Sequence, residues 1–205
     1  MPPDPFAPVT DVAGLPRVLL IGDSISEGYT APVQKLLQGK ANVHRVPENG
    51  GSTKTGMTKI EQWLGTSKWD IIHFNWGLHD LMFNPNLQPD PVQYEKDQLV
   101  LYDKNLRSLT ARLKQTGAKL IWATSTPVPE EISSPRSPSH RSQMVKVYNE
   151  VAKRVMAENG IPIDDLNAYV SPVQDKMQKP HDVHFGIEGS EFLAKKIGLE
   201  YQLLL

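Results

Sequence analysis

Short apolar runs of strand length alternate along this chain with longer segments of helical periodicity. The runs with strand character are residues 18–21, 43–46, 71–75, 120–123 and 161–163. Apolar side chains recur at steps of three and four residues over 99–113 and 144–156, and these stripes end before Gly117 and Gly160. Parallel strands need crossover connections, which are usually helices. The alternation therefore predicts an α/β fold, with helices on both faces of a parallel sheet.

The length and the charge of the chain narrow the function classes. A chain of 205 residues and 22.9 kDa fits one domain with one core. Its 22 basic and 23 acidic residues leave a formal net charge of −1, which offers no basic surface for nucleic acid or an anionic membrane. Cysteine is absent, so disulfides, a thiolate nucleophile and a cysteine-ligated metal are excluded. We expect a neutral or weakly charged substrate, and no partner protein is indicated.

The proline-rich start of the chain is predicted to be separate from the core. We interpret residues 1–16 as an extended leader and residues 17–205 as the single domain. A leader of this kind can remain after a signal peptide is removed, which favours a secreted or periplasmic protein, although an ordinary cytosolic tail fits equally well. No stretch approaches the roughly 20 apolar residues of a spanning helix, so we expect no membrane span.

The first apolar run stops at the turn Gly22-Asp23-Ser24, and the chain becomes helix-like from about Tyr29. In a parallel sheet this turn lies at the carboxyl edge, where ligands bind. A sharp strand-to-helix turn can expose a serine hydroxyl as a nucleophile. Asp and Ser after a strand also form helix N-caps, and the tripeptide alone favours that simpler interpretation.

A second signal near the C-terminus favours the nucleophile. Serine needs a base to accept its proton and a carboxylate to orient that base. The segment Asp182-Val183-His184 supplies both, so we predict Ser24 as nucleophile, His184 as base and Asp182 as orienting carboxylate. Residues two apart in an extended segment face the same side, which lets Asp182 and His184 lie together. If the carboxylate does not reach the ring, a Ser24–His184 dyad assisted by a backbone carbonyl is the alternative.

Two further short motifs lie between the serine turn and the C-terminal Asp-x-His: residues 49–52 (Asn-Gly-Gly-Ser) and residues 77–80 (Gly-Leu-His-Asp). The four motifs, or blocks, in this order resemble the SGNH (GDSL-type) hydrolases. The resemblance covers nearly the whole chain from Arg17 onward. It implies a flavodoxin-like three-layer α/β/α sandwich around a five-stranded parallel sheet. It also implies a serine ester hydrolase that works through an acyl-enzyme and needs no cofactor.

The resemblance further implies an oxyanion hole built by the second and third blocks. Besides the N–H of Ser24, the second block supplies the N–H of Gly51. The third block of the family normally carries an asparagine donor, but this chain has His79 there, and a histidine N–H can also donate. We predict His79 in this role and Asn75 as the reserve amide donor. The last block also differs from the family pattern. The Asp of the family usually precedes the His by three residues, whereas Asp182 precedes His184 by two.

The loops expected around this site suggest the substrate. Residues 76–91 and 127–141 are polar and include no long apolar cap, which favours a small acyl group on a polar carrier. Trp76 and Phe83 are candidate substrate-binding residues, although they can equally pack the loop. Many members of the resembling family are carbohydrate acetylesterases, so acetyl esters of carbohydrate are the first hypothesis. The alternatives are a thioesterase or lysophospholipase of the same family, and a non-catalytic carbohydrate-binding protein in which His79 has abolished the oxyanion hole.

A metal site is the remaining alternative, because several acidic and histidine residues are expected at the same edge: Asp23, Asp80, Asp182, His79 and His184. Their spacing lacks a compact ligand motif such as His-Glu-x-x-His. A serine triad explains their positions without a metal, so we predict neither a metal nor another cofactor.

Overall fold

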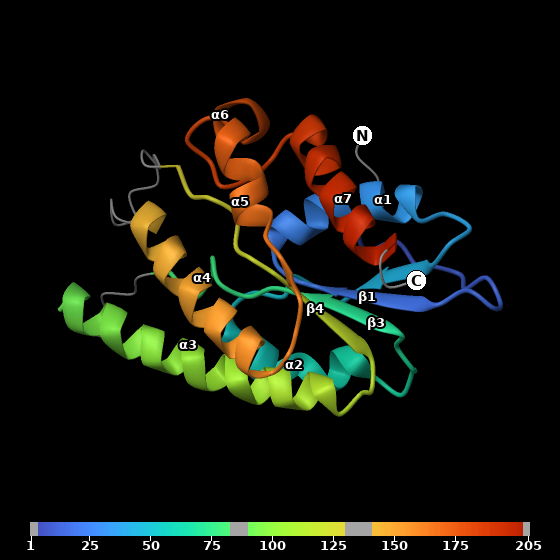
Figure 1. Cartoon of the computed structure of the whole chain (residues 1–205), viewed down its shortest axis with the longest axis horizontal. Coiled ribbons are helices and arrows are strands. Elements are labelled where there is room, and N and C mark those ends of the chain that lie inside the picture. The colour runs from blue at the N-terminus through green and yellow to red at the C-terminus, as the bar shows by residue number, and fades with distance from the viewer. Residues whose placement is uncertain (1–3, 83–89, 130–140, 203–205) are drawn as a thin grey trace.

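The computed structural model of the chain describes residues 4–82, 90–129 and 141–202 (Figure 1). Its centre is a five-stranded sheet with the order β2-β1-β3-β4-β5, in which every neighbouring pair is parallel. The strands are β1 (Arg17–Ile21), β2 (Asn42–Arg45), β3 (Ile71–Phe74), β4 (Lys119–Ala123) and β5 (Ile163–Asp164). The predicted α/β fold with a five-stranded parallel sheet is confirmed.

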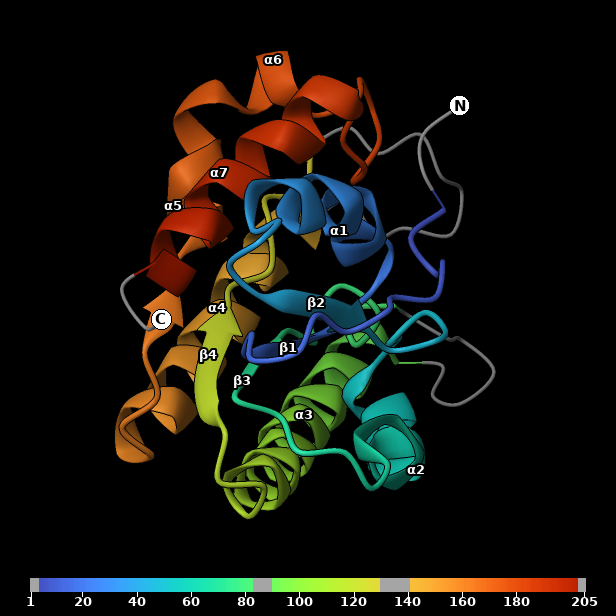
Figure 2. The same cartoon turned by 90° about the vertical axis from the view of Figure 1, so that its right-hand side faces the viewer.

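Helices cover both faces of the sheet. They are α1 (Ser24–Leu36), α2 (Thr53–Leu64), α3 (Pro91–Lys114), α4 (Arg141–Glu158), α5 (Leu166–Val170), the 3-10 helix η1 (Ser171–Val173), α6 (Gln174–Met177) and α7 (Ile187–Gln202). Figure 2 shows α1 and α7 on one side of the strands and α2 and α3 on the other. The two predicted helical stripes belong to α3 and α4, and Gly117 and Gly160 follow these helices with φ of 73° and 66°.

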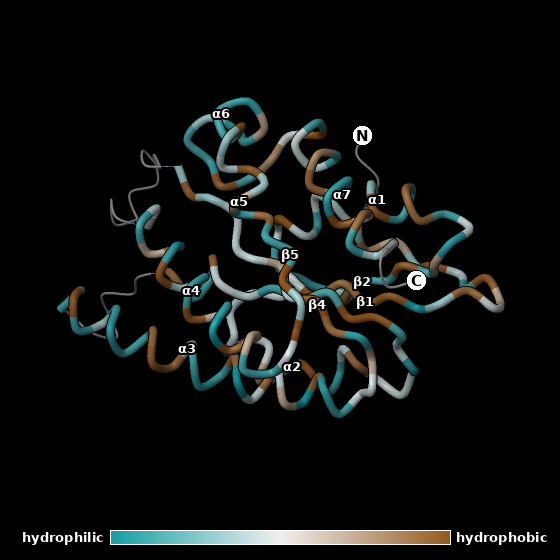
Figure 3. The backbone as a smooth tube through the Cα atoms, viewed as in Figure 1, coloured by the Kyte–Doolittle hydropathy of each residue, from teal (hydrophilic) through white to brown (hydrophobic). Residues whose placement is uncertain are grey.

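The core lies along the central strands because both of their faces are covered. Val18 to Ile21 of β1 and Ile71 and Ile72 of β3 are at most 1% exposed. Figure 3 shows the corresponding concentration of hydrophobic residues in the middle of the molecule. Near-continuous apolar strands of this kind are typical of a sheet between two helical layers.

The N-terminal segment lies against this domain. Residues 4–16 form no helix or strand. The side chain of Asn42 on β2 accepts a hydrogen bond from the N–H of Val12 and donates to the carbonyls of Val12 and Leu15. Asp11 forms an ion pair with Arg17 and a hydrogen bond of 2.6 Å with the ring of His44. No helix in the described ranges is both long and apolar enough to cross a membrane.

The strand order defines where a ligand can bind. The chain passes from β1 to β2 on one side and then returns to β3 on the other side of β1. Such a switch point leaves a crevice outside the carboxyl ends of the strands. Ser24 follows β1 and His79 follows β3, so both lie at this edge.

Candidate active site

Ser24 lies at the tight turn between β1 and α1. Helix α1 begins at Ser24 itself, earlier than the predicted start near Tyr29, because Asp23 caps it. The Asp23 carboxylate accepts the N–H of Ile25 at 2.9 Å, and the hydroxyl of Ser26 donates to the Asp23 carbonyl at 2.7 Å. The cap and the nucleophile role are therefore compatible, since Asp23 forms the cap and leaves the hydroxyl of the half-buried Ser24 free for another partner.

That partner is the imidazole of His184. Ser24 Oγ lies 2.8 Å from His184 Nε2, although the two residues are 160 positions apart in the chain. On the other side of the ring, His184 Nδ1 lies 2.7 Å from Asp182 Oδ1. The structure therefore brings the three residues into one hydrogen-bonded line, at distances suited to proton transfer. The side chains of His184 and Asp182 are 42% and 40% exposed, so the line opens to solvent.

Asp182 reaches the ring through a turn, and the expectation of an extended segment here is wrong. The Lys179 N–H donates to the His184 carbonyl at 2.9 Å, and the Asp182 N–H donates to the Lys179 carbonyl at 3.2 Å. His181, inside this turn, has a φ of 54°, a left-handed conformation uncommon for a residue other than glycine. Asp182 Oδ1 also accepts the backbone N–H of His184 at 3.2 Å, so the short spacing still places carboxylate and ring together.

The charge of Asp182 suits this position. Partial burial raises the pKa of its carboxyl, but hydrogen bonds from the ring and backbone of His184 outweigh that effect, and the pKa lies below its usual value. Asp182 is therefore ionised at neutral pH. An ionised carboxylate at Nδ1 favours the tautomer with its proton on Nδ1, which leaves Nε2 of His184 free to accept the proton of Ser24.

Two of the predicted oxyanion donors have no competing acceptor. The N–H of Ser24, at the first position of α1, makes no hydrogen bond within the described residues, as expected at a helix N-terminus. The half-buried ring of His79 likewise has no hydrogen bond in that part of the chain. Burial raises the pKa of Asp23, and the hydrogen bond from the Ile25 N–H opposes the rise.

The third predicted donor, Gly51, is engaged by a neighbouring side chain. Gly51 has a φ of 57°, and its N–H donates to Asn49 Oδ1 at 2.9 Å. The adjacent Gly50 N–H donates to the carbonyl of Gly22 at 2.9 Å. A Cβ on Gly50 would lie 2.6 Å from that carbonyl oxygen, so only glycine allows this approach. The second block therefore contacts the nucleophile turn directly.

Two further predicted site residues are held by neighbouring elements. The side-chain amide of Asn75 donates to the Ala123 carbonyl at 2.7 Å and to Ser125 Oγ at 3.3 Å, so both of its protons are engaged and it stays in reserve behind His79. Trp76 is 1% exposed and donates to the Gly50 carbonyl at 3.2 Å. It packs beneath the second block, and its assignment as a substrate contact is wrong. Phe83 lies outside the described residues.

The third block is tied to the start of α2 by Asp80. Its two carboxylate oxygens each lie 3.0 Å from the N–H of Thr53, and one accepts the Thr53 hydroxyl at 2.6 Å. Burial raises the pKa of Asp80 to about 6, although the hydrogen bonds from Thr53 oppose the rise. Asp80 is thus a structural link between the blocks that carry Gly51 and His79.

This raised pKa makes a prediction about stability. The folded chain holds the Asp80 proton up to about pH 6, whereas the ordinary value is 3.8. The folded state therefore binds more protons between these values, and the contribution of Asp80 to stability is fully present below pH 3.8 and is lost as pH rises through 6. In urea unfolding across this range, we expect the free energy of unfolding of the wild type to fall relative to Asp80→Asn by roughly 3 kcal/mol. Parallel curves for the two proteins would contradict this.

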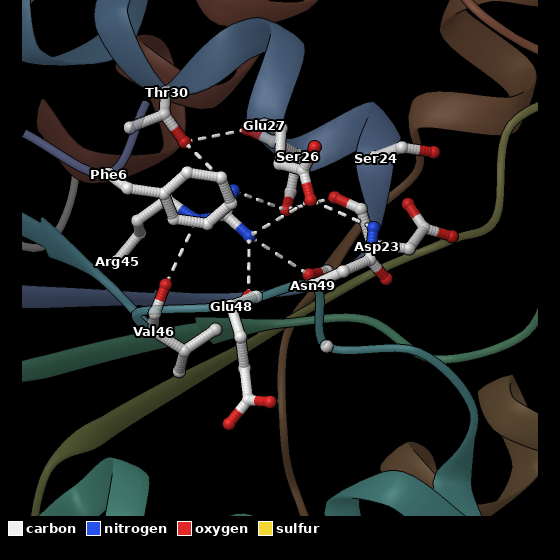
Figure 4. A network of polar contacts seen from close by, with 12 residues as sticks. Phe6, Asp23, Ser24, Ser26, Glu27, Thr30, Arg45, Val46, Glu48 and Asn49 are labelled. Carbon is white, nitrogen blue, oxygen red and sulfur yellow. Dashed lines mark hydrogen bonds and ion pairs between the residues drawn. The ribbon is translucent and has the colours of Figure 1, made fainter. Parts of the chain in front are cut away.

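A further side chain beside the nucleophile turn escaped the sequence analysis. Arg45 ends β2, and its side chain is only 2% exposed. Figure 4 shows its guanidinium among polar groups of α1 and the loop after β2, with Phe6 across it. The only signal in the sequence is a charged residue inside the apolar run 43–46, which does not reveal its partners.

The fold and this geometry together define a class of protein. A serine, a histidine and an aspartate in hydrogen-bonded order, at the carboxyl edge of a parallel α/β/α sheet, are typical of serine hydrolases. The model of the GDSL-like lipase/acylhydrolase family matches residues 20–192, and the chain belongs to this family. The protein is accordingly a serine hydrolase that acts on carboxylic esters, and the resemblance to SGNH hydrolases is confirmed.

Solved structures share the fold over nearly the whole chain. The lipase/acylhydrolase from Enterococcus faecalis is 21% identical with a TM-score of 0.72, and the alignment covers 92% of this chain and 96% of that one. The acetyl xylan esterase AlAXEase is 16% identical with a TM-score of 0.69, covering 92% and 100%. The acetylxylan esterase Axe2 from Geobacillus stearothermophilus is 20% identical with a TM-score of 0.68, covering 89% and 92%. No curated protein matches the sequence.

Proposed function

We propose that this protein hydrolyses short-chain acyl esters, with acetyl groups on carbohydrate as the first substrate class. The observation that carries the proposal is the hydrogen-bonded line from Ser24 Oγ through His184 to Asp182, with distances of 2.8 and 2.7 Å. In this proposal Ser24 is the nucleophile, His184 the base and then the acid, and Asp182 the orienting carboxylate, so the triad replaces the dyad as the preferred mechanism.

The reaction would proceed in two halves. Ser24 Oγ attacks the ester carbonyl carbon while His184 Nε2 accepts the serine proton. The N–H of Ser24, the ring of His79 and the N–H of Gly51 stabilise the oxyanion, with Gly51 sharing its proton between the oxyanion and Asn49. His184 then protonates the leaving alcohol as the acyl-enzyme forms. In the second half, His184 Nε2 takes a proton from a water molecule as the water attacks the acyl-enzyme. The ring then returns this proton to Ser24 Oγ as the acyl–oxygen bond breaks and the carboxylic acid leaves.

The exposure of the triad suits a polar carrier. The side chains of His184 and Asp182 are 42% and 40% exposed, so the site is open to solvent on their side. The polar sequences of residues 76–91 and 127–141, which include no long apolar cap, support a small acyl group. Acetyl xylan esterases among the structures with this fold agree with acetylated polysaccharide as the carrier.

A series of p-nitrophenyl esters from acetate to octanoate, with Ser24→Ala as the blank, tests this proposal. We expect a Ser24-dependent rate that is highest for acetate, and release of acetate from acetylated xylan by the same protein. A rate that climbs with chain length would instead favour the lysophospholipase or thioesterase alternative. No rate above the blank, together with no labelling of Ser24 by a fluorophosphonate, would favour the non-catalytic carbohydrate-binding protein.

The role of His79 makes a separate prediction. Removing one side-chain donor from an oxyanion hole typically costs about 10²- to 10³-fold in kcat, and we expect this loss for His79→Ala. The variant His79→Asn should keep most of the activity, because an amide also donates a hydrogen bond and does not titrate. Both variants are compared with wild type by kcat on p-nitrophenyl acetate. Equal kcat for His79→Ala and wild type would remove His79 from the oxyanion hole.

A further inference from the structure

The guanidinium of Arg45 is buried among acceptors from three segments of the chain (Figure 4). Its nitrogens donate to the carbonyls of Val46 at 3.1 Å, Gly22 at 3.2 Å and Glu48 at 3.3 Å, and to the hydroxyls of Ser26 at 3.1 Å and Thr30 at 3.3 Å. Only arginine carries five donors in a planar arrangement that can bind so many acceptors at once.

The backbone acceptors belong to the turn and the loop that carry proposed oxyanion donors. One nitrogen of Arg45, Nη2, donates both to the Gly22 carbonyl in the nucleophile turn and to the Glu48 carbonyl in the loop that leads to Gly51. The Gly22 carbonyl also accepts the Gly50 N–H, so the loops meet at this oxygen. A single cationic group therefore contacts both the turn of Ser24 and the loop of the second block, beside the direct hydrogen bond between Gly50 and Gly22.

A side-chain relay extends this contact to Gly51 itself. Glu27, in the first turn of α1, has its Oε1 4.0 Å from Arg45 Nη2. The same oxygen accepts the side-chain amide of Asn49 at 2.8 Å, and Asn49 Oδ1 accepts the Gly51 N–H at 2.9 Å. The orientation of the Gly51 N–H thus depends on Asn49, whose amide is fixed by Glu27 beside the guanidinium.

The N-terminal segment covers the remaining side of Arg45. The ring centroid of Phe6 lies 5.0 Å from the guanidinium carbon, within the range of a cation–π contact. Burial lowers the pKa of Arg45, and the nearby Glu27 opposes this change. A desolvated cation makes stronger hydrogen bonds than an exposed one, which adds to the rigidity of the loops that it holds.

We propose that Arg45 is a positioning residue for the active site, which holds the Ser24 and Gly51 N–H groups at the separation that the oxyanion requires. The proposal rests on the proposed function, because it assumes that these two groups stabilise the oxyanion. Arg45 touches neither substrate nor the reacting atoms, and acts through the Gly22 carbonyl and through the relay of Glu27 and Asn49.

The first test compares Arg45→Lys with Arg17→Lys. Arg17 is a matched control, since it stacks on Trp69 at 4.2 Å, pairs with Asp11 and lies at the opposite end of β1 from Ser24. We expect Arg45→Lys to lower kcat by about 10- to 100-fold with KM within about twofold, because a misplaced donor costs part of its contribution. Arg17→Lys should lower Tm without changing kcat. An unchanged kcat in a folded Arg45→Lys would overturn the proposal.

Asn49→Ala tests the relay should Arg45→Lys fail to fold, because it removes only the link to Gly51. We expect kcat to fall by about tenfold, since the Gly51 N–H loses its fixed direction. An increase in kcat would overturn the proposal, because it would mean that Asn49 competes with the oxyanion for this N–H.

Hydrogen exchange does not depend on turnover, so it tests the positioning role of Arg45 separately from the proposed esterase function. Hydrogen exchange of the Gly51 amide, followed by NMR, should accelerate by about tenfold or more in Asn49→Ala and in folded Arg45→Lys. The amide of Gly117, which also has a positive φ but lies at the opposite edge of the sheet, should not change. An unaltered Gly51 amide would overturn the role of Arg45 whatever the activity. Accelerated exchange in a protein without Ser24-dependent hydrolysis would contradict the proposed function and leave the loop-positioning contact supported.

Discussion

Replacing Ser24 with alanine is expected to lower kcat for p-nitrophenyl acetate by about 10⁴-fold or more, because the nucleophile is lost. The change removes only Oγ, whose one described partner is His184 Nε2 at 2.8 Å. The Asp23 carboxylate still caps α1 through the Ile25 N–H. Tm should therefore stay close to that of the wild type, and circular dichroism should show the same helix content.

The companion variant His184→Ala should lose activity on the same scale, and the double variant should lose little more than either single one. Ser24 and His184 act as a unit, so removing either abolishes the same step. Fluorophosphonate labelling should fail in all three variants, because two of them lack Ser24 and the serine of His184→Ala is not activated. Comparable full activity in Ser24→Ala would contradict the mechanism, and fully additive losses would show that the two side chains act independently.

The layers of the fold could be predicted from the sequence because each strand and its helix carry their own periodicity. The run 18–21 became β1 (Arg17–Ile21), and the run 120–123 became β4 (Lys119–Ala123), each within one residue. Buried parallel strands are apolar on both faces, so their signal does not depend on knowing their neighbours. The order of the strands comes from the structure, since no local pattern determines which strands pair.

The candidate site could be predicted only where a residue had a local signature. Ser24 follows an apolar strand at a tight turn, and His184 is the last residue of the short motif Asp-Val-His, so both have such signatures. The sequence did not reveal the partners of Asn75 and Trp76, because these partners are the carbonyls of Ala123 and Gly50, which belong to other elements. A polar or aromatic residue near the sheet edge looks the same in sequence whether it faces the substrate or a backbone carbonyl.

Arg45 was missed for the same physical reason. In the sequence it is one charge inside an apolar run, and its five acceptors come from the turn before α1, from α1 itself and from the loop after β2. Burying a guanidinium is unfavourable unless its donors are satisfied. Whether they are satisfied depends on the folded arrangement of all three segments, which no spacing within one segment reveals.

Substitutions of Asp182 give the second large effect, and their ranking identifies what the carboxylate does. If Asp182 orients and stabilises the charged ring of His184, Asp182→Asn should lower kcat by about 10³- to 10⁴-fold. An asparagine can turn its amide toward Nδ1 and favour the tautomer with the proton on Nε2, which cannot accept the proton of Ser24. Asp182→Ala should lose less, about 10²-fold, because the position is 40% exposed and water can replace the carboxylate at Nδ1.

A purely structural role for Asp182 predicts the opposite order. Its Oδ1 also accepts the His184 backbone N–H at 3.2 Å, a bond that asparagine can keep and alanine cannot. If holding the turn were the main contribution, Asp182→Ala would be the more damaged variant in both kcat and Tm. Small and equal losses would instead support the Ser24–His184 dyad. Measuring kcat and Tm for both variants therefore separates the three cases. We expect Asp182→Asn to have the lower kcat and a Tm at or above that of Asp182→Ala, because the tautomer of His184 matters more to the reaction than the turn does.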